Sequence, residues 1–156
     1  MVKDISIYME TKFNFNSQVC TSRSQSEKLL ALGLKKETAD MHWFYTGKIH
    51  GWQHCSSETY IEAISHPFKK EWATNGVIQP AWSLHRLLSL LPDYIVVNSS
   101  SGLNPNFYLN IRDGFVSYKD NRGFSYSSTS GNMYDAITRM ISFLIKEGYF
   151  NKEYLV

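Results

Sequence analysis

Residues 24–33 have the hydrophobic and polar pattern of a short helix. Ser24 and Glu27 stand three positions apart at its start, which is the spacing of a capping box. Leucines fill its interior, and Gly33 followed by Leu34 is a pair that commonly ends a helix, because glycine adopts the left-handed conformation without steric cost. The pattern predicts a helix whose two ends are both defined.

Two further segments, 83–91 and 133–147, place apolar residues at the three- and four-residue spacing of a helix. Ser83 can cap the first segment, and Pro92 prevents its continuation. Asn132 can cap the second segment. The apolar stripe of the second segment consists of Met133, Ala136, Ile137, Met140, Ile141 and Leu144. Both segments are therefore predicted to be helices that bury one face.

Residues 106–120 predict a β-hairpin, because Asp113 and Gly114 separate two runs of β-forming residues. A two-residue type I′ turn at this point would pair Arg112 with Phe115, Ile111 with Val116, and Leu109 with Tyr118. That register places five apolar residues on one face: Phe107, Leu109, Ile111, Val116 and Tyr118. The turn and the apolar alternation agree, and a slip of one residue would destroy this agreement.

The remaining segments are less sharply defined. Residues 1–20 alternate loosely and suggest a strand, which could pair within the chain or with another chain. Residues 42–46 suggest a strand followed by a loop, and 93–97 a further short strand. Residues 57–68 suit either a helix capped by Ser57 or a strand. Together with the three helices and the hairpin, these segments predict an α+β fold: a small, mostly antiparallel sheet with about three helices packed on one side.

The composition fits one domain over residues 1–156, with 43% hydrophobic and 19% charged residues. The net charge of +2 gives no electrostatic reason to expect nucleic acid as the partner. Asp4 and Glu10 interrupt the apolar residues near the start, so this stretch has neither the core of a signal peptide nor a membrane span. We therefore expect a cytoplasmic protein without a membrane partner.

Three segments, taken in order, are similar to those of a family of small, functionally uncharacterised proteins encoded on prophages and other mobile elements of gut bacteria. These segments are QSEKLLALGLKKETADM (25–41), PAWSLHRLLSLLP (80–92) and MYDAITRMISFLIKEGY (133–149). The resemblance implies a mobile-element setting. It implies no activity, cofactor or catalytic residue.

The strongest candidate for metal chemistry is a group of three residues close in sequence, His50, His54 and Cys55. Imidazole and thiolate are common zinc and iron ligands, although Gly47 and Gly51 argue against a helix that would align the two histidines. The chain has no G-x-S-x-G, Walker or G-x-G-x-x-G motif, so we expect no cofactor. A small metal-dependent enzyme is the alternative that these three residues leave open.

Nucleic-acid binding is a second alternative, because cations stand beside aromatic residues at two places. Lys69 and Lys70 precede Trp72, and Lys119 and Arg122 lie near Tyr118 and Phe124. Such neighbours can combine attraction to phosphate with stacking on bases.

The aromatic segment 43–55 favours protein binding. We name five residues there as the candidate partner-binding site: Trp43, Tyr45, His50, Trp52 and His54. Protein interfaces take much of their binding energy from Trp and Tyr, whereas a loop needs few large rings to fold. We therefore expect a non-catalytic accessory protein that binds an unknown protein partner, and the sequence leaves a homo-oligomer open.

Overall fold

The computed structural model describes residues 18–45, 51–65, 78–98, 102, 104–112 and 114–156, and it has the α+β architecture predicted from the sequence. The helices are α1 (Arg23–Ala31), α2 (Ser57–Ser65), α4 (Leu84–Ser89) and α5 (Met133–Lys146), with short 3-10 helices η1 (Lys36–Thr38) and η2 (Lys152–Tyr154). The strands are β1 (Met41–Tyr45), β2 (Trp52–Ser56), β3 (Ile78–Ala81), β4 (Tyr94–Val96), β5 (Asn106–Arg112), β6 (Phe115–Lys119) and β7 (Ser125–Thr129).

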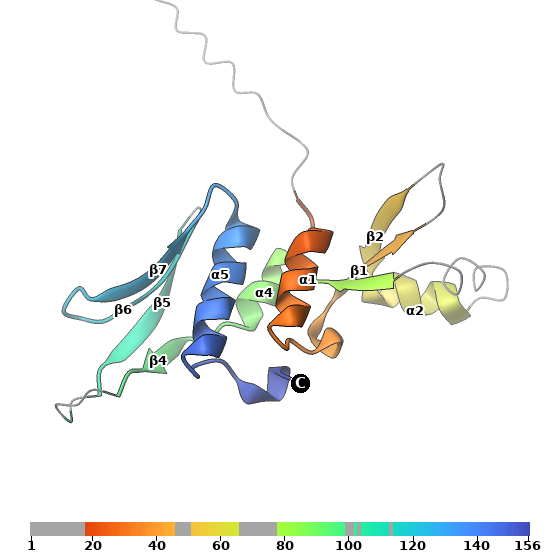
Figure 1. Cartoon of the computed structure of the whole chain (residues 1–156). Coiled ribbons are helices and arrows are strands. Elements are labelled where there is room, and N and C mark those ends of the chain that lie inside the picture. The colour runs from red at the N-terminus through yellow and green to blue at the C-terminus, as the bar shows by residue number, and fades with distance from the viewer. Residues whose placement is uncertain (1–17, 46–50, 66–77, 99–101, 103, 113) are drawn as a thin grey trace, which may run out of the picture.

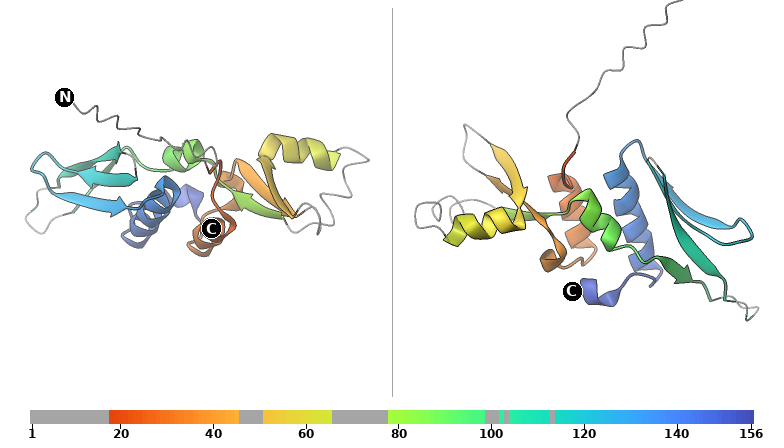
Figure 2. Two further views of the ribbon diagram at one scale, coloured as in Figure 1. Left: turned by 90° about the horizontal axis from the view of Figure 1, so that it is seen from above. Right: turned by 180° about the vertical axis from the view of Figure 1, so that it is seen from behind.

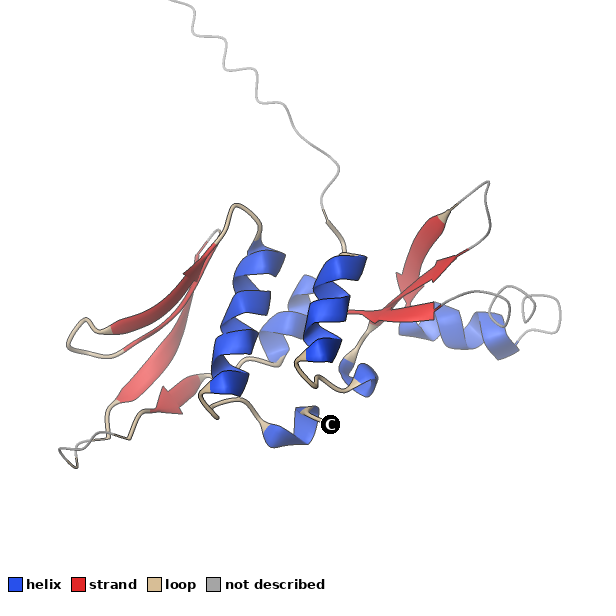
Figure 3. Ribbon diagram, viewed as in Figure 1, coloured by secondary structure: helices blue, strands red, loops and turns tan. Residues whose placement is uncertain are grey.

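Helices α1, α4 and α5 occupy the middle of the molecule, between two antiparallel sheets (Figure 1). One sheet has the order β2-β1-β3 and carries α2, and the other has the order β4-β5-β6-β7. Figure 2 shows from above and from behind that the sheets lie at opposite ends of this helical layer. The strands thus form two sheets rather than the one small sheet expected, as the colouring by secondary structure makes plain (Figure 3).

Helix α5 supplies the centre of the hydrophobic core. It contacts β6 and β7 on one side and α1 and α4 on the other. Its fully buried residues are Ala136, Ile137, Met140, Ile141 and Leu144. The two largest buried rings outside α5 have their polar atoms satisfied: the indole N–H of Trp82 donates to Thr38 Oγ1 at 2.9 Å, and the hydroxyl of Tyr118 donates to the carbonyl of Pro92 at 2.6 Å.

The predicted hairpin register is confirmed. Strands β5 and β6 pair Arg112 with Phe115, Ile111 with Val116, and Leu109 with Tyr118. Gly114 has a φ of +64°, as a turn of the predicted kind requires, and Asp113 lies outside the described residues. Phe107, Val116 and Tyr118 are buried on the face toward α5, so the alternation predicted the correct face.

The start of α1 differs from the prediction by two residues. The capping box is formed by Ser22 and Gln25, not by Ser24 and Glu27. Ser22 Oγ accepts from the Gln25 N–H at 3.2 Å, and Gln25 Oε1 accepts from the Ser22 N–H at 2.8 Å. The Gln25 amide also donates to Asp135 Oδ1 on α5 at 2.6 Å, a tertiary contact that Glu27 does not make in this arrangement.

The other predicted helix boundaries agree better with the structure. Leu34 donates its N–H to the carbonyl of Leu29 and Gly33 to that of Leu30, which is the Schellman arrangement expected at this end. Ser83 and Asn132 cap α4 and α5 through their side chains, as predicted.

The ambiguous segment forms helix over its described part, as α2. Its first turn is capped by Ser56, whose Oγ accepts from the Thr59 N–H at 3.2 Å, rather than by Ser57. Residues 66–68 of that segment and the strand predicted over 1–20, up to residue 17, lie outside the described residues.

The C-terminal residues fasten onto the turn that follows α1. Leu34 forms a β-bridge with Leu155, and the Lys35 N–H donates to the Tyr154 carbonyl at 2.8 Å. The Val156 N–H donates to the Gly33 carbonyl at 2.8 Å. We call these contacts the C-terminal clasp. They cover Leu34, which is fully buried.

None of the helices in the described part of the chain combines the length and the apolar character that a membrane crossing requires.

Candidate functional site

The candidate partner-binding residues lie mostly on a β-hairpin, not on the loop that the sequence predicted. Strand β1 pairs with β2 in an antiparallel register that sets Trp43 opposite His54 and Tyr45 opposite Trp52. The expected strand at 42–46 is confirmed as β1, whereas Trp52 and His54 belong to a second strand. Residues 46–50, which include His50, lie outside the described residues. Backbone pairing therefore holds four of the five side chains.

These four side chains share one face of the sheet, because alternate residues of a strand point to the same side. We call the set Trp43, Tyr45, Trp52 and His54 the aromatic face. Trp43 and His54 meet edge to face, with ring centroids 5.2 Å apart and an interplanar angle of 86°. Tyr45 and Trp52 are tilted at 55° with centroids 5.6 Å apart. Each cross-strand pair thus makes direct ring contact.

Arg23, the first residue of α1, extends over this face. Its guanidinium carbon lies 3.8 Å from the centroid of the Trp52 ring, which is a close cation–π contact. Its Nε donates to Gln79 Oε1 at 3.3 Å, and Gln79 Nε2 donates back to the Arg23 carbonyl at 3.0 Å. The cation is therefore held by β3 and by the indole at the same time.

Trp43 has a structural role beside any binding role. Its indole N–H donates to the Thr21 carbonyl at 2.7 Å, and this bond ties β1 to the residues that precede α1. Its side chain is half-buried, as is that of Trp52. Tyr45 is 37% exposed and His54 is exposed. Tyr45, Trp52, His54 and Arg23 thus form the part of the face that a partner can reach.

The metal-binding alternative loses its geometric basis in the described residues. His54 and Cys55 are consecutive on β2, so their side chains point to opposite faces of the sheet. No group of three or more His, Cys, Asp or Glu residues suited to a metal occurs in the part of the chain that the structure describes. His50, the third candidate, lies outside it.

The opposite face of the hairpin carries His42 and Cys55, which are directly paired across β1 and β2. His42 stacks on Tyr60 of α2 with centroids 4.9 Å apart, and its Nδ1 lies 3.2 Å from Ser57 Oγ. Burial lowers the pKa of His42, although the nearby carboxylate of Asp40 opposes this shift. Burial thus favours the neutral form of the imidazole, which packs α2 against the sheet.

Neither cysteine has the properties of an activated nucleophile. Burial raises the pKa of Cys20 to about 11, with a further contribution from the charge of Asp40. Burial also raises the pKa of Cys55. Catalytic cysteines need the opposite shift, because the thiolate is the reactive form.

The first group of residues proposed for nucleic-acid binding, Lys119, Arg122, Tyr118 and Phe124, comes together only in part. Tyr118 is fully buried, so it cannot stack on a base. Arg122 forms a salt bridge with Asp120 at 2.9 Å. Phe124 is 65% exposed, and the Arg122 guanidinium carbon lies 5.6 Å from its ring centroid. Lys119 lies over a different ring, that of Phe115, at 5.6 Å. The second proposed group, Lys69, Lys70 and Trp72, lies outside the described residues.

Sequence reasoning missed the contributions of Arg23 and Gln79 to the site. The two residues are 56 positions apart, and Arg23 has the pattern of an ordinary exposed helix residue. No local signal connects either of them with Trp52. Only the pairing of β3 with β1, which brings Gln79 opposite Trp43, places them there.

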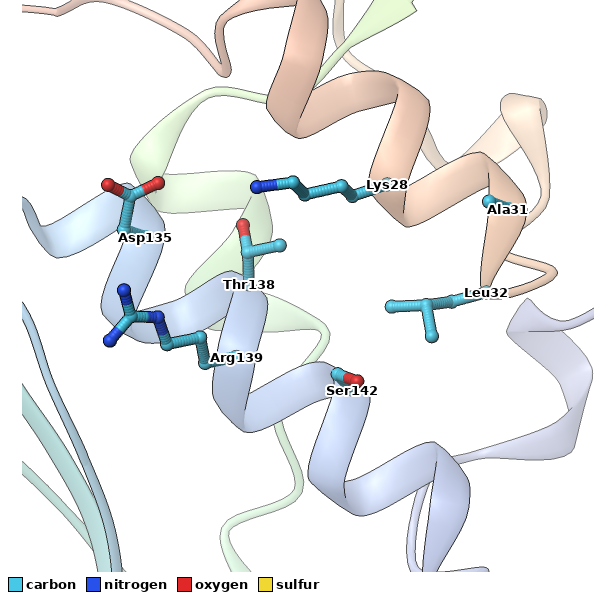
Figure 4. Close-up of a pocket in the computed structure, with 7 residues that line it drawn as sticks. All are labelled: Lys28, Ala31, Leu32, Asp135, Thr138, Arg139 and Ser142. Carbon is cyan, nitrogen blue, oxygen red and sulfur yellow. The ribbon is translucent and has the colours of Figure 1, made fainter.

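A groove of about 350 Å³ lies at the surface between α1 and α5 and is lined by residues of both helices (Figure 4). Its rim is polar, with Lys28 extending from α1 toward α5 and with Asp135 and Arg139 on α5. Asp135 is engaged by the Gln25 amide. None of the candidate site residues predicted from the sequence lines this groove.

Searches against protein-family models, curated proteins and solved structures found no match to this chain.

Proposed function

We propose that this protein is a non-catalytic accessory protein of a phage or other mobile element, and that it binds another protein through the aromatic face. The resemblance of its three helical segments to mobile-element proteins supports the setting. The observation that carries the binding proposal is the stack of Arg23 on Trp52, next to the exposed Tyr45.

Trp, Tyr and Arg are the residues most enriched at the energetic centres of protein interfaces. Here they are held on paired strands and by the bonds between Arg23 and Gln79, so little conformational entropy remains to be lost on binding. A rigid aromatic surface with one cation suits a partner that offers an apolar pocket with a carboxylate at its edge.

The test is a double substitution, Trp52→Ala with His54→Ala, in the full chain used as bait for affinity capture from the native host. We expect recovery of the main partner to fall by at least about thirtyfold, as for loss of a binding hot spot. The melting temperature should change by less than about 4 °C, because an exposed cation–π contact and an edge contact contribute on the order of 1 kcal/mol.

Tyr94 and Tyr108 provide a matched control. They form a cross-strand aromatic pair on the other sheet, with centroids 6.1 Å apart and exposures of 53% and 51%. The variant Tyr94→Ala with Tyr108→Ala should recover as much of the main partner as the unsubstituted chain does. If both double variants lose the main partner equally, the aromatic face is not the binding surface. Full recovery of the partner with Trp52→Ala and His54→Ala would lead to the same conclusion.

If the variant Trp52→Ala with His54→Ala unfolds, the side chains of Trp52 and His54 belong to the core, and Tyr45→Ala alone then tests the surface.

The same protein preparations test the two alternative functions, a metal-dependent enzyme and a nucleic-acid-binding protein. Stoichiometric zinc or iron that is lost in His50→Ala with His54→Ala would favour a metal-dependent enzyme instead. A gel shift at low salt that weakens steeply with added salt would favour nucleic acid.

A further inference from the structure

Strand β7 presents one open edge. It ends the order β4-β5-β6-β7, and no strand in the described part of the chain pairs with its other side. The Asp120 N–H donates to the Phe124 carbonyl at 3.0 Å, and the Ser130 N–H donates to the Gly114 carbonyl at 2.9 Å. Because backbone groups alternate in direction along a strand, those of Ser125, Ser127 and Thr129 point away from β6.

The sequence of the edge strand itself lacks the usual devices that prevent strand addition. Natural edge strands are commonly short, charged, bulged or interrupted by proline. Strand β7 has the sequence SYSST, without a charge or a proline, and its pairing with β6 is regular over five residue pairs. The opposite edge, β4, is only three residues long. The unprotected edge of the sheet is therefore β7.

A groove of about 410 Å³ runs along this edge, between β7 and α5. The residues that line it are Tyr126, Ser127, Ser128, Thr129, Arg139, Met140 and Phe143. The rings of Tyr126 and Phe143 stack with their centroids 5.1 Å apart, so part of the lining is aromatic. Ser128 Oγ is buried and has no hydrogen-bond partner within the described residues. The groove thus offers apolar surface to a ligand.

Arg139 gives the groove its charge. Among the described residues that line it, Arg139 is the one basic residue, and none of them is acidic. Its Nη1 donates to the outward carbonyl of Thr129 at 3.2 Å, which places the guanidinium at the Thr129 end of the edge. A guanidinium has five N–H groups, so this bond leaves donors for a carboxylate.

We propose that the β7 edge and the β7–α5 groove bind an extended peptide from a partner protein, which adds to the sheet as an antiparallel strand. Main-chain hydrogen bonds to Ser125, Ser127 and Thr129 supply affinity, and alternate apolar side chains enter the groove. In the antiparallel direction the amino-terminal residue of the peptide lies beside Ser130, so that it and every second residue after it point to the same side of the sheet as Ser128 and Tyr126, toward α5. An Asp or Glu at that position, on the same face as the apolar residues, meets Arg139.

The first test is calorimetric titration of the full chain with the peptide acetyl-ETVTVT-amide and its neutral counterpart acetyl-QTVTVT-amide. The glutamate and both valines share one face of the extended peptide. We expect the acidic peptide to bind about tenfold more tightly, as one charge-assisted contact allows. In Arg139→Gln the two affinities should become equal. Equal affinities in the unsubstituted protein, or no binding of either peptide, would overturn the proposal.

The second test separates backbone pairing from simple adhesion to the groove. Ser127→Pro removes an N–H that points outward, so it should abolish peptide binding, whereas Ser127→Ala keeps that N–H and should bind normally. If Ser127→Pro does not fold, a peptide N-methylated at the amides that face β7 serves instead. Binding that survives both changes refutes strand addition. A concentration-dependent dimer that Ser127→Pro disrupts would show that a second copy occupies the edge, which also overturns the proposal.

Discussion

Gly114 and Gly123 allow the close packing of the β5–β6 turn to be measured against a matched control. Both have positive φ, +64° and +92°. A Cβ on Gly123 would meet open space, whereas a Cβ on Gly114 would collide with the backbone carbonyl of Ser130. That carbonyl cannot move away freely, because the Ser130 N–H donates to the Gly114 carbonyl at 2.9 Å.

The expected losses of stability follow from the positive φ of both glycines and from the collision with the Ser130 carbonyl at Gly114. A residue other than glycine in the left-handed region costs on the order of 1 kcal/mol or somewhat more, and both alanine variants share this cost. The gain from a less flexible unfolded chain, about 0.4–1 kcal/mol, is also common to both. Overpacking against a fixed backbone adds about 1–3 kcal/mol at Gly114 alone. Gly114→Ala should therefore lose about 2 kcal/mol more than Gly123→Ala.

Urea denaturation followed by circular dichroism measures this difference. The midpoint should fall further for Gly114→Ala than for Gly123→Ala, with equal slopes, since a changed slope would indicate an altered unfolded state. Equal losses in the two variants would mean that the Ser130 carbonyl yields without cost. A Gly114→Ala variant as stable as the unsubstituted protein would refute both the cost of the positive φ and the cost of the collision with Ser130.

Two further outcomes test the helix start and the buried thiol. Ser22→Ala should lower the free energy of unfolding by about 1 kcal/mol in urea denaturation while Ser24→Ala changes it little, and the reverse result would return the cap to Ser24. Cys20 has its pKa raised from 9.0 to about 11, so above pH 9 the unfolded chain loses a proton that the folded chain keeps, and stability falls. Between pH 9 and 10 this loss should be on the order of 1 kcal/mol smaller in Cys20→Ala, and an unchanged pH dependence would contradict the burial of the thiol.

The sequence predicted those elements whose determinants are local. The hairpin at Gly114 was predicted with its register, because turn chemistry and apolar alternation lie within fifteen residues and agree. The caps at Ser83 and Asn132 were predicted for the same reason. The start of α1 was not, because two overlapping boxes fit the motif and Gln25 is selected by a contact to Asp135, 110 positions away.

The candidate site was predicted only in part. The richness in Trp and Tyr drew attention to 43–55, but the segment WQHCS has too few β-branched residues to mark β2 as a strand. Its pairing with β1 moved Cys55 to the face opposite His54 and so separated two residues that looked like neighbours. Arg23 entered the site through the packing of α1 near β3, which no spacing in the sequence encodes.

The C-terminal clasp bears on the order of events during folding. The Lys35 ammonium donates to the Glu153 carbonyl at 2.8 Å across 118 positions of sequence, and the neighbouring backbone bonds span similar separations. Closing a loop of that length is slow compared with forming a helix or a hairpin. During synthesis on the ribosome, Leu34 therefore stays uncovered until residues 154–156 have emerged. Until then the end of α1 exposes apolar surface, to which chaperones or other incompletely folded chains can bind.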